Sequence, residues 1–275
     1  MTTDAQARQT LLIVETVPER LFRVARVIET DGVISSSMPT GAWIERGDAK
    51  VPAGSLGVLV DNVLGHAVLV ERPPDHWSVS SEISIDLCAP IESGATLFAQ
   101  ARPVHSDACG AVTSGEVVDD RGRLVAVCRQ HGRYVSHLPK LDEVQQRVPD
   151  PADETASPPA SVYDLLGGKP VPGKVSAVLQ MTATPHLVNP LGNVHGGITL
   201  CAADVTAIAA LEGPGHPMTT ASIHVAYVRP IPLGTSATFT ATVVHAGRTF
   251  AVARVDARNA HGKICATATV TAAAG

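Results

Sequence analysis

The stretch Asn189–Leu211, NPLGNVHGGITLCAADVTAIAAL, decides the fold that this sequence predicts. It opens with a polar turn, passes through His195, Gly196 and Gly197, and continues as a long apolar run of good helix formers. This order is typical of a loop that leads into the N-terminus of a helix. Because the run is apolar on nearly every face, we expect its helix, Gly196–Leu211, to lie inside a core.

A single acid, Asp204, interrupts this apolar run. Burial of a carboxylate costs several kcal/mol unless other groups compensate for the lost water. An acid in the middle of a core helix therefore indicates a functional site.

Composition excludes several classes of protein. The chain has 275 residues, of which 45% are hydrophobic, enough for one large domain or two small ones. The net charge of −5 gives no basic footprint for nucleic acid. No apolar run looks long enough to span a membrane, and the N-terminus lacks the basic-then-apolar order of a signal peptide. We expect no nucleic-acid or membrane partner and a cytoplasmic location.

The metal-binding residue types form no recognisable motif. The eleven histidines show no H-E-x-x-H and no paired ligand spacing, so no metal site is predicted. The five cysteines form no C-x-x-C, and we expect them to be reduced thiols of the core. They are Cys88, Cys109, Cys128, Cys201 and Cys265.

The chain contains an internal repeat. Val51–Gly65, VPAGSLGVLVDNVLG, aligns with Val194–Ile208, VHGGITLCAADVTAI, at an offset of 143 residues, which places Asp61 on Asp204. Further along the chain the offset is 140 residues. The pairs at this second offset are Pro90 with Pro230, Gly94 with Gly234, His105 with His245, and Gly122 with Gly262. We interpret this as a tandem duplication.

Each half of the repeat predicts a strand, a loop, a helix and four further strands. The expected class is α+β, with a long antiparallel sheet wrapped around one central helix in each unit. The predicted domains are residues 1–137 and 171–275, joined by a linker at 138–170 that is rich in proline, acids and small residues. Leu11–Val17 is expected to pack on the first domain as a short helix or strand.

The turn before the second helix carries a motif, Asn-x-x-Gly-x-x-His-Gly-Gly, with an Asp nine residues beyond the His. This motif resembles the hotdog-fold acyl-CoA thioesterases of the phenylacetate-pathway (PaaI-like) type, and the resemblance covers most of residues 175–272. Tyr227–Pro230 and Gly247-Arg248 also stand where that family has similar residues. The first half resembles the family more faintly, through LVDN at 59–62. The resemblance implies a tandem double hotdog.

The turn and helix suit thioester hydrolysis. A helix N-terminus offers free backbone N–H groups and a favourable dipole. Gly196 and Gly197 lack side chains, so an acyl carbonyl can approach their amides closely. A facing carboxylate can activate water as a general base, or attack directly and form an anhydride. No G-x-S-x-G motif provides a serine nucleophile.

The resemblance implies a site between two hotdog units, with the acid from one unit and the turn from the other. One composite site joins Asn189, His195 and Gly196 of the second half to Asp61 of the first. Ser80, ten residues before Pro90, is predicted to assist the acid by its spacing alone.

The second composite site joins Asp204 and Thr220 to the first-half turn. That turn has Arg46 opposite Asn189, Pro52 opposite His195 and Ala53 opposite Gly196. Pro52 has no N–H to donate. We therefore predict one working site, that of Asp61, and a degenerate Asp204 site.

Structural alternatives remain for each site residue. His195 fits the role of an orienting group better than that of the base, and Asp61 could instead cap a neighbouring backbone. Asn189 could simply begin a turn. Gly197, Arg229 and Arg248 are predicted to contact coenzyme A, with the arginines at its phosphates, although solvated strand-end arginines are commoner.

The leading function is an acyl-CoA thioesterase, with Asp61 as general base or nucleophile, the Gly196 N–H as oxyanion donor, and coenzyme A present as part of the substrate. One alternative is an acyl-CoA binding or sensing protein without catalysis. Another is a hotdog hydratase acting on an enoyl thioester. The acyl preference, the carrier of the thioester and assembly of two chains into a homodimer stay open.

Overall fold

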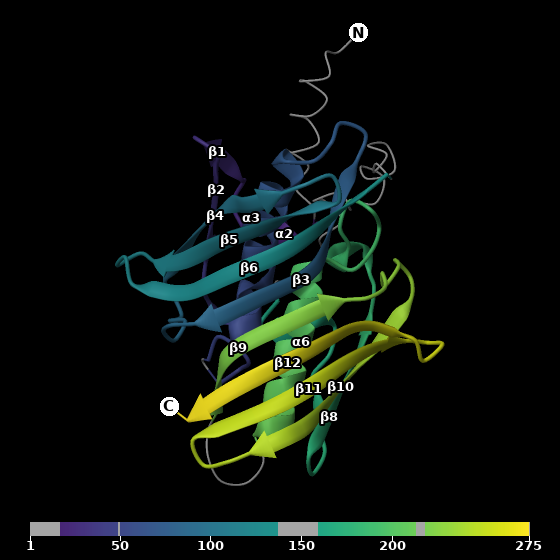
Figure 1. Ribbon diagram of the computed structural model, residues 1–275. Helices are drawn as coiled ribbons and strands as arrows, with labels where there is room; N and C mark the ends of the chain where they lie inside the picture. The colour runs from purple at the N-terminus through teal and green to yellow at the C-terminus, as the bar shows by residue number, and fades with distance from the viewer. Residues whose placement is uncertain (1–16, 49, 137–158, 213–217, 275) are drawn as a thin grey trace.

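A computed structural model describes residues 17–48, 50–136, 159–212 and 218–274. In this part of the chain twelve strands form one sheet, ordered β1-β2-β4-β5-β6-β3-β9-β12-β11-β10-β8-β7. Two long helices, α3 and α6, lie against the same face of this sheet, one under each half (Figure 1). The predicted α+β class, with a long antiparallel sheet around one helix in each half, is confirmed.

The strands alternate buried and exposed residues, as expected for a sheet with one face on the core. In the first half they are β1 (Ile28–Thr30), β2 (Val33–Pro39), β3 (Trp77–Leu87), β4 (Thr96–Ser106), β5 (Gly110–Asp119) and β6 (Leu124–Val135). In the second half they are β7 (Val171–Pro172), β8 (Ser176–Thr182), β9 (Met218–Tyr227), β10 (Ser236–Ala246), β11 (Phe250–Asn259) and β12 (Ile264–Ala274).

The two core helices cross where both begin. Helix α3 spans Gly57–Val70 and follows a short 3₁₀ turn, η2, at Ala53–Leu56, whereas α6 spans Gly196–Leu211 as predicted. A Cβ atom at Gly197 would lie only 2.3 Å from the Gly57 carbonyl oxygen. The crossing is this close because both positions lack a side chain. It brings the start of each helix against the helix of the other half.

The expectation that no apolar run could span a membrane was wrong by length and composition. The helical segment Ala53–Val70 has 18 residues and a mean hydropathy of 1.5. However, 78% of it is buried inside the molecule. The segment is this long and apolar because it is the core helix of the first half.

A pseudo-twofold axis relates the two halves. The edge-to-edge pairing of β3 with β9 joins them into one sheet, and Ser84 pairs with His224 near the middle of this pairing. These two residues are equivalent at the offset of 140. Ser84 Oγ lies 2.8 Å from His224 Nδ1. Antiparallel strands that cross at equivalent residues are what a twofold axis through the sheet requires.

The repeat extends to irregular features. The ladder shifts register between Pro103 and His105 in β4, and between Val243 and His245 in β10. The matched glycines Gly94 and Gly234 have positive φ angles of 82° and 78°. The sequence match between these glycines therefore reflects equivalent left-handed turns.

Part of the range expected to be a linker is helical. Helix α5 spans Val162–Leu166, begins with a cap in which Ser161 accepts from the Asp164 N–H, and ends at Gly167 with a φ of 74°. The Val162 N–H donates to the Glu45 carbonyl oxygen at 2.8 Å, so α5 is attached to the first half. Most of the expected linker, residues 138–158, lies outside the described residues, as does nearly all of Leu11–Val17.

The expectation that all five cysteines lie in the core was wrong for two of them. Cys128, Cys201 and Cys265 are buried, and burial raises the pKa of the Cys128 thiol to about 12. Cys88 and Cys109 are exposed. Cys88 follows the last residue of β3, and Cys109 lies in the turn between β4 and β5, so both lie beyond the ends of the strands.

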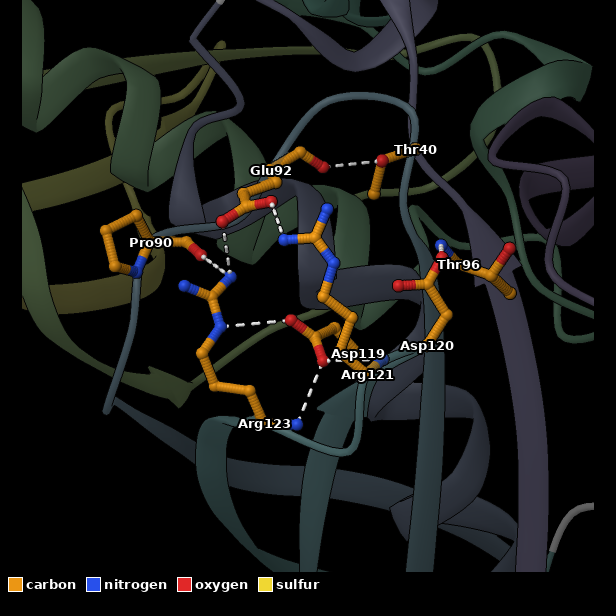
Figure 2. Close-up of polar contacts among 8 residues, drawn as sticks. All are labelled: Thr40, Pro90, Glu92, Thr96, Asp119, Asp120, Arg121 and Arg123. Atoms are coloured by element: carbon orange, nitrogen blue, oxygen red, sulfur yellow. Dashed lines mark hydrogen bonds and ion pairs between the residues drawn. The ribbon is translucent and has the colours of Figure 1, made fainter.

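A polar network fixes the loop that follows β3 (Figure 2). The Arg123 guanidinium donates to the Pro90 carbonyl oxygen at 3.2 Å and pairs with Glu92 at 3.1 Å. The same guanidinium pairs with Asp119 at 3.0 Å, and Thr40 Oγ1 donates to the Glu92 carbonyl oxygen at 2.7 Å. The loop is therefore held to the strands on both sides of it.

Candidate active site

A cavity of about 360 Å³ lies between the two halves, beside the start of α6. It is bounded by residues from α3 and β3 of the first half and from the α6 turn and β9 of the second. Five predicted catalytic residues line it, namely Asp61, Ser80, Asn189, His195 and Gly196. The sixth, Asp204, does not.

The carboxylate of Asp61 is held from three sides. Its Oδ2 accepts a hydrogen bond from the Gly197 N–H at 3.0 Å and lies 3.1 Å from His195 Nδ1. Its Oδ1 accepts from the Ser80 hydroxyl at 2.8 Å, and Gln130 Nε2 donates to that hydroxyl at 3.1 Å. The side chain keeps about 10% of its surface exposed, so the carboxylate reaches the cavity.

His195 connects Asp61 to a second carboxylate. It is the N-cap of α6, where its Nδ1 accepts from the Gly197 N–H at 3.1 Å. Its Nε2 lies 3.5 Å from Oε1 of Glu19, on helix α2 (Val17–Leu21). Burial lowers the pKa of His195, but the carboxylates of Asp61 and Glu19 outweigh burial and raise it above the usual value.

Gly196 presents its backbone to the cavity. Within the described residues its N–H has no hydrogen-bond acceptor, whereas its carbonyl oxygen accepts from the Tyr227 hydroxyl at 2.9 Å. Burial raises the pKa of the Tyr227 hydroxyl, and the nearby Asp61 carboxylate raises it further. The hydroxyl therefore keeps its proton and acts as a donor. A free N–H at the first position of a helix is a donor for a ligand oxygen.

Asn189 both forms its turn and lines the cavity. Its Oδ1 accepts from the Leu191 N–H at 3.0 Å and from the Asn193 N–H at 3.2 Å. This is an Asx turn, the structural alternative considered for this residue. Because Oδ1 is engaged, Nδ2 is the part of the amide left to donate into the cavity.

The residues predicted to contact coenzyme A are not gathered at one place. Arg229 lines the cavity, is exposed, and donates to the Ile264 carbonyl oxygen at 2.8 Å. Arg248 lies in the turn between β10 and β11 and does not line this cavity. Gly197 is buried and its N–H is engaged by Asp61.

The second acid has equivalent contacts without access to solvent. Asp204 Oδ1 accepts from the Thr220 hydroxyl at 2.6 Å, and Oδ2 accepts from the Gly54 N–H at 2.7 Å. The carboxyl group is fully buried. Burial raises the pKa of Asp204, an effect that the Thr220 and Gly54 donors oppose but do not cancel. These hydrogen bonds satisfy the buried carboxyl group of Asp204, but its burial leaves no space for a substrate beside it.

Sequence reasoning missed three residues of the site. Glu19 lies in a segment without clear periodicity, and Gln130 follows the ordinary alternation of a strand. Tyr227 belongs to the YVRP segment, whose family resemblance was the one available signal. All three act through contacts with residues far away in the chain.

Comparisons with known proteins identify the family of the chain. The model of the thioesterase superfamily matches residues 191–266, and that of the acyl-CoA thioesterase C-terminal domain matches residues 22–134. Acyl-coenzyme A thioesterase 13 of Homo sapiens and of Pongo abelii are each 34% identical over 98 residues, which cover 34% of this chain and 69% of the relative.

Solved structures share the fold over most of the chain. The tesB protein of Mycobacterium avium subs. paratuberculosis has a TM-score of 0.64 and 10% identity, with 94% of this chain and 99% of that chain covered. The 12:0-ACP thioesterase from Umbellularia californica has a TM-score of 0.59 and 12% identity, with coverages of 88% and 94%. The family models and the curated relatives lead to one conclusion: the chain belongs to the thioesterase superfamily and is a thioester hydrolase.

Proposed function

We propose that this enzyme hydrolyses acyl-CoA thioesters to a free acid and coenzyme A, with Asp61 as the reacting carboxylate. The observation that carries the proposal is the meeting of Asp61 with the N-terminus of α6 at a cavity, beside the unengaged N–H of Gly196. The name of the curated relative, acyl-coenzyme A thioesterase 13, supports coenzyme A as the thiol.

The acyl carbonyl oxygen would accept a hydrogen bond from the Gly196 N–H. The helix dipole of α6 favours the negative charge that develops on this oxygen as the carbonyl carbon becomes tetrahedral. Asn189 lines the same cavity, and its Nδ2 would donate a second hydrogen bond to this oxygen. Loss of one such oxyanion donor costs about 100- to 1,000-fold in kcat in other enzymes.

Asp61 has two chemical routes. As a general base it removes a proton from a water molecule, whose oxygen bonds to the acyl carbon while the carbon–sulfur bond breaks and the thiolate leaves. As a nucleophile it bonds to the acyl carbon itself, expels the thiolate, and forms an anhydride that water then cleaves. In both routes Ser80 and Gly197 hold the carboxylate in position.

The coenzyme A moiety is assigned to the mouth of the cavity. Arg229 lines the cavity and is exposed, so its guanidinium is available to a phosphate group. Arg248 lies outside the lining, so we give it no part in this contact.

The test is thiol release from short, long and aromatic acyl-CoAs by the intact enzyme, Asp61→Asn and Asp204→Asn. Asp204 is a matched control because it is the pseudo-twofold equivalent of Asp61. We expect Asp61→Asn to lose about 100- to 10,000-fold in kcat, and Asp204→Asn to retain activity. Loss in Asp204→Asn alone would overturn the assignment of the acid. Retention of acyl-CoA without thiol release would favour a binding protein.

A further inference from the structure

A second cavity of about 450 Å³ lies at the pseudo-twofold equivalent of the first. The resemblance holds residue by residue in the lining. Arg46, Pro52 and Ala53 replace Asn189, His195 and Gly196, and the segment Leu87–Ile91 replaces Tyr227–Ile231. A volume of this size falls within the range of about 300–1,000 Å³ that small-molecule sites occupy.

We infer that this second cavity binds an acyl-CoA molecule without hydrolysing it. The choice of ligand rests on the proposed function, because the cavity is built from the same parts of the fold as the active site. Its lining is mainly apolar, which suits an acyl chain. The large apolar side chains that line it are Val51, Leu87, Ile91, Ile208 and Met218.

Two cationic side chains line the same cavity. Arg46 is already paired with Glu212 and with Asp48, and its side chain is only 8% exposed, so it belongs to the wall. Lys50 is exposed, and no acid among the described residues pairs with its ammonium group. Lys50 is therefore the cation available to a phosphate or carboxylate of the ligand.

Two differences from the first site explain why hydrolysis is absent. Asp204 is fully buried and does not line the cavity, whereas Asp61 lines the first. Ala53 occupies the position of Gly196, where an added Cβ atom would lie 2.6 Å from the Asp61 carboxylate. Ala53 lines the second cavity, so a methyl group stands there where the first site has only the Gly196 backbone.

The wall of the second cavity is held in place before any ligand binds. Pro90 lines it, and the Arg123 network holds the Pro90 carbonyl oxygen (Figure 2). The equivalents of Arg123 and Glu92 in the second half are Lys263 and Pro232, which cannot form the same ion pairs. A preorganised wall reduces the entropy lost on binding.

The chain contains its own reporter for the test. Cys88 is exposed and lines the second cavity, whereas Cys109 is exposed and lines neither cavity. The probe is a thioether analogue of an acyl-CoA, which cannot be hydrolysed. Alkylation of each cysteine by iodoacetamide is followed by mass spectrometry during titration, with binding stoichiometry from calorimetry. We expect the probe to slow alkylation of Cys88 at least 10-fold, leave Cys109 unchanged, and bind at two molecules per chain.

A matched pair of variants separates the two cavities. Ala89→Trp fills the second cavity and Arg229→Trp, at the equivalent position, fills the first. Ala89→Trp should reduce the stoichiometry to one, whereas Arg229→Trp should leave the protection of Cys88 intact. Continued resistance of the buried Cys128 and Cys201 to alkylation serves as the control for folding.

The outcomes separate this inference from the proposed function. Thiol release from acyl-CoA with full alkylation of Cys88 and one bound probe would overturn the inference alone. Protection of Cys88 without thiol release would overturn the proposed function and leave the inference standing. Protection of Cys88 by a free fatty acid but not by the thioether would overturn the choice of ligand. Titration with coenzyme A alone tests whether the head group of the ligand binds in this cavity.

Discussion

A Cβ atom at Gly196 would lie 2.6 Å from Oδ2 of Asp61, closer than real side-chain contacts. The glycine is therefore what allows the carboxylate of the first half and the helix start of the second to share one cavity. We expect Gly196→Ala to displace the carboxylate and to reduce kcat about 100-fold, because misplacement of a reacting group by about 1 Å has that effect. Thiol release from an acyl-CoA measures it. The reverse change at the equivalent position, Ala53→Gly, should not reduce activity.

The two hydroxyl groups that hold the acids should have different effects. Ser80→Ala removes a hydrogen bond to Asp61, and we expect a loss of about 10- to 100-fold in kcat, as for a hydrogen bond to a charged group. Thr220→Ala should leave kcat unchanged and lower the free energy of unfolding by about 1–3 kcal/mol, since Asp204 is buried. Steady-state kinetics and urea denaturation of both variants check this pair. Equal kinetic losses would show that both acids take part in hydrolysis.

Glu19 should control the protonation of His195. The raised pKa of His195 stabilises the fold below the usual histidine pKa of about 6.5, and that stabilisation is lost as the pH rises through the folded-state pKa. Glu19→Gln removes one of the two carboxylates that raise this pKa. The loss should then be smaller and should occur at lower pH.

Unfolding by urea between about pH 5 and pH 9, with the His195 ring followed by NMR, measures the effect of Glu19→Gln. Glu29→Gln is a suitable control, because it makes the same charge change on the exposed strand β1. An unchanged titration of His195 in Glu19→Gln would show that this pair does not form in solution.

Asp204→Asn should change how the stability of the fold depends on pH. Because burial raises the pKa of Asp204, its contribution to stability is complete below the unfolded-state pKa of about 3.9 and falls as the pH rises through the folded-state pKa. The asparagine variant lacks this loss, so its stability relative to the intact chain should rise over that window and then level off. Urea denaturation as a function of pH measures it, with Asp75→Asn, at an exposed acid, as the control.

The helix crossing should tolerate no side chain. A Cβ atom at Gly197 would lie 2.3 Å from the Gly57 carbonyl oxygen and 2.5 Å from the Val58 nitrogen, both backbone atoms. We expect Gly197→Ala to lower the free energy of unfolding by about 1–3 kcal/mol. Gly65→Ala, in the interior of α3 with its nearest neighbour at 3.8 Å, should raise it by about 0.5–1 kcal/mol. A stable Gly197→Ala variant would mean that the two helices can separate.

Much of the fold could be predicted from local patterns. The bounds of α6 were predicted because its apolar run begins directly after a polar turn. The strands followed from alternation between turn residues, and the match of Gly94 with Gly234 in the repeat corresponds to two turns with positive φ. Helix α5 was missed inside the expected linker, because its five residues are too few to show a period.

The candidate site was only partly predictable. The internal repeat and the motif identified Asp61, His195 and Gly196, since each stands at a marked position of a helix or turn. Glu19 and Gln130 could not be predicted, because their roles depend on partners 176 and 50 residues away, at His195 and Ser80. The exposure of Cys88 also depends on where β3 ends in the folded sheet.

The sequence by itself determined the duplicated unit, its two apolar helices with one acid each, and the polar turn before the second helix. These features are local, so the order of residues along the chain is enough to specify them. Only the tertiary structure decided which acid faces a cavity. Both acids accept the same backbone hydrogen bond from the opposite half, at Gly197 and Gly54. What distinguishes them is the packing around each carboxylate, which leaves Asp61 beside open space and encloses Asp204 completely.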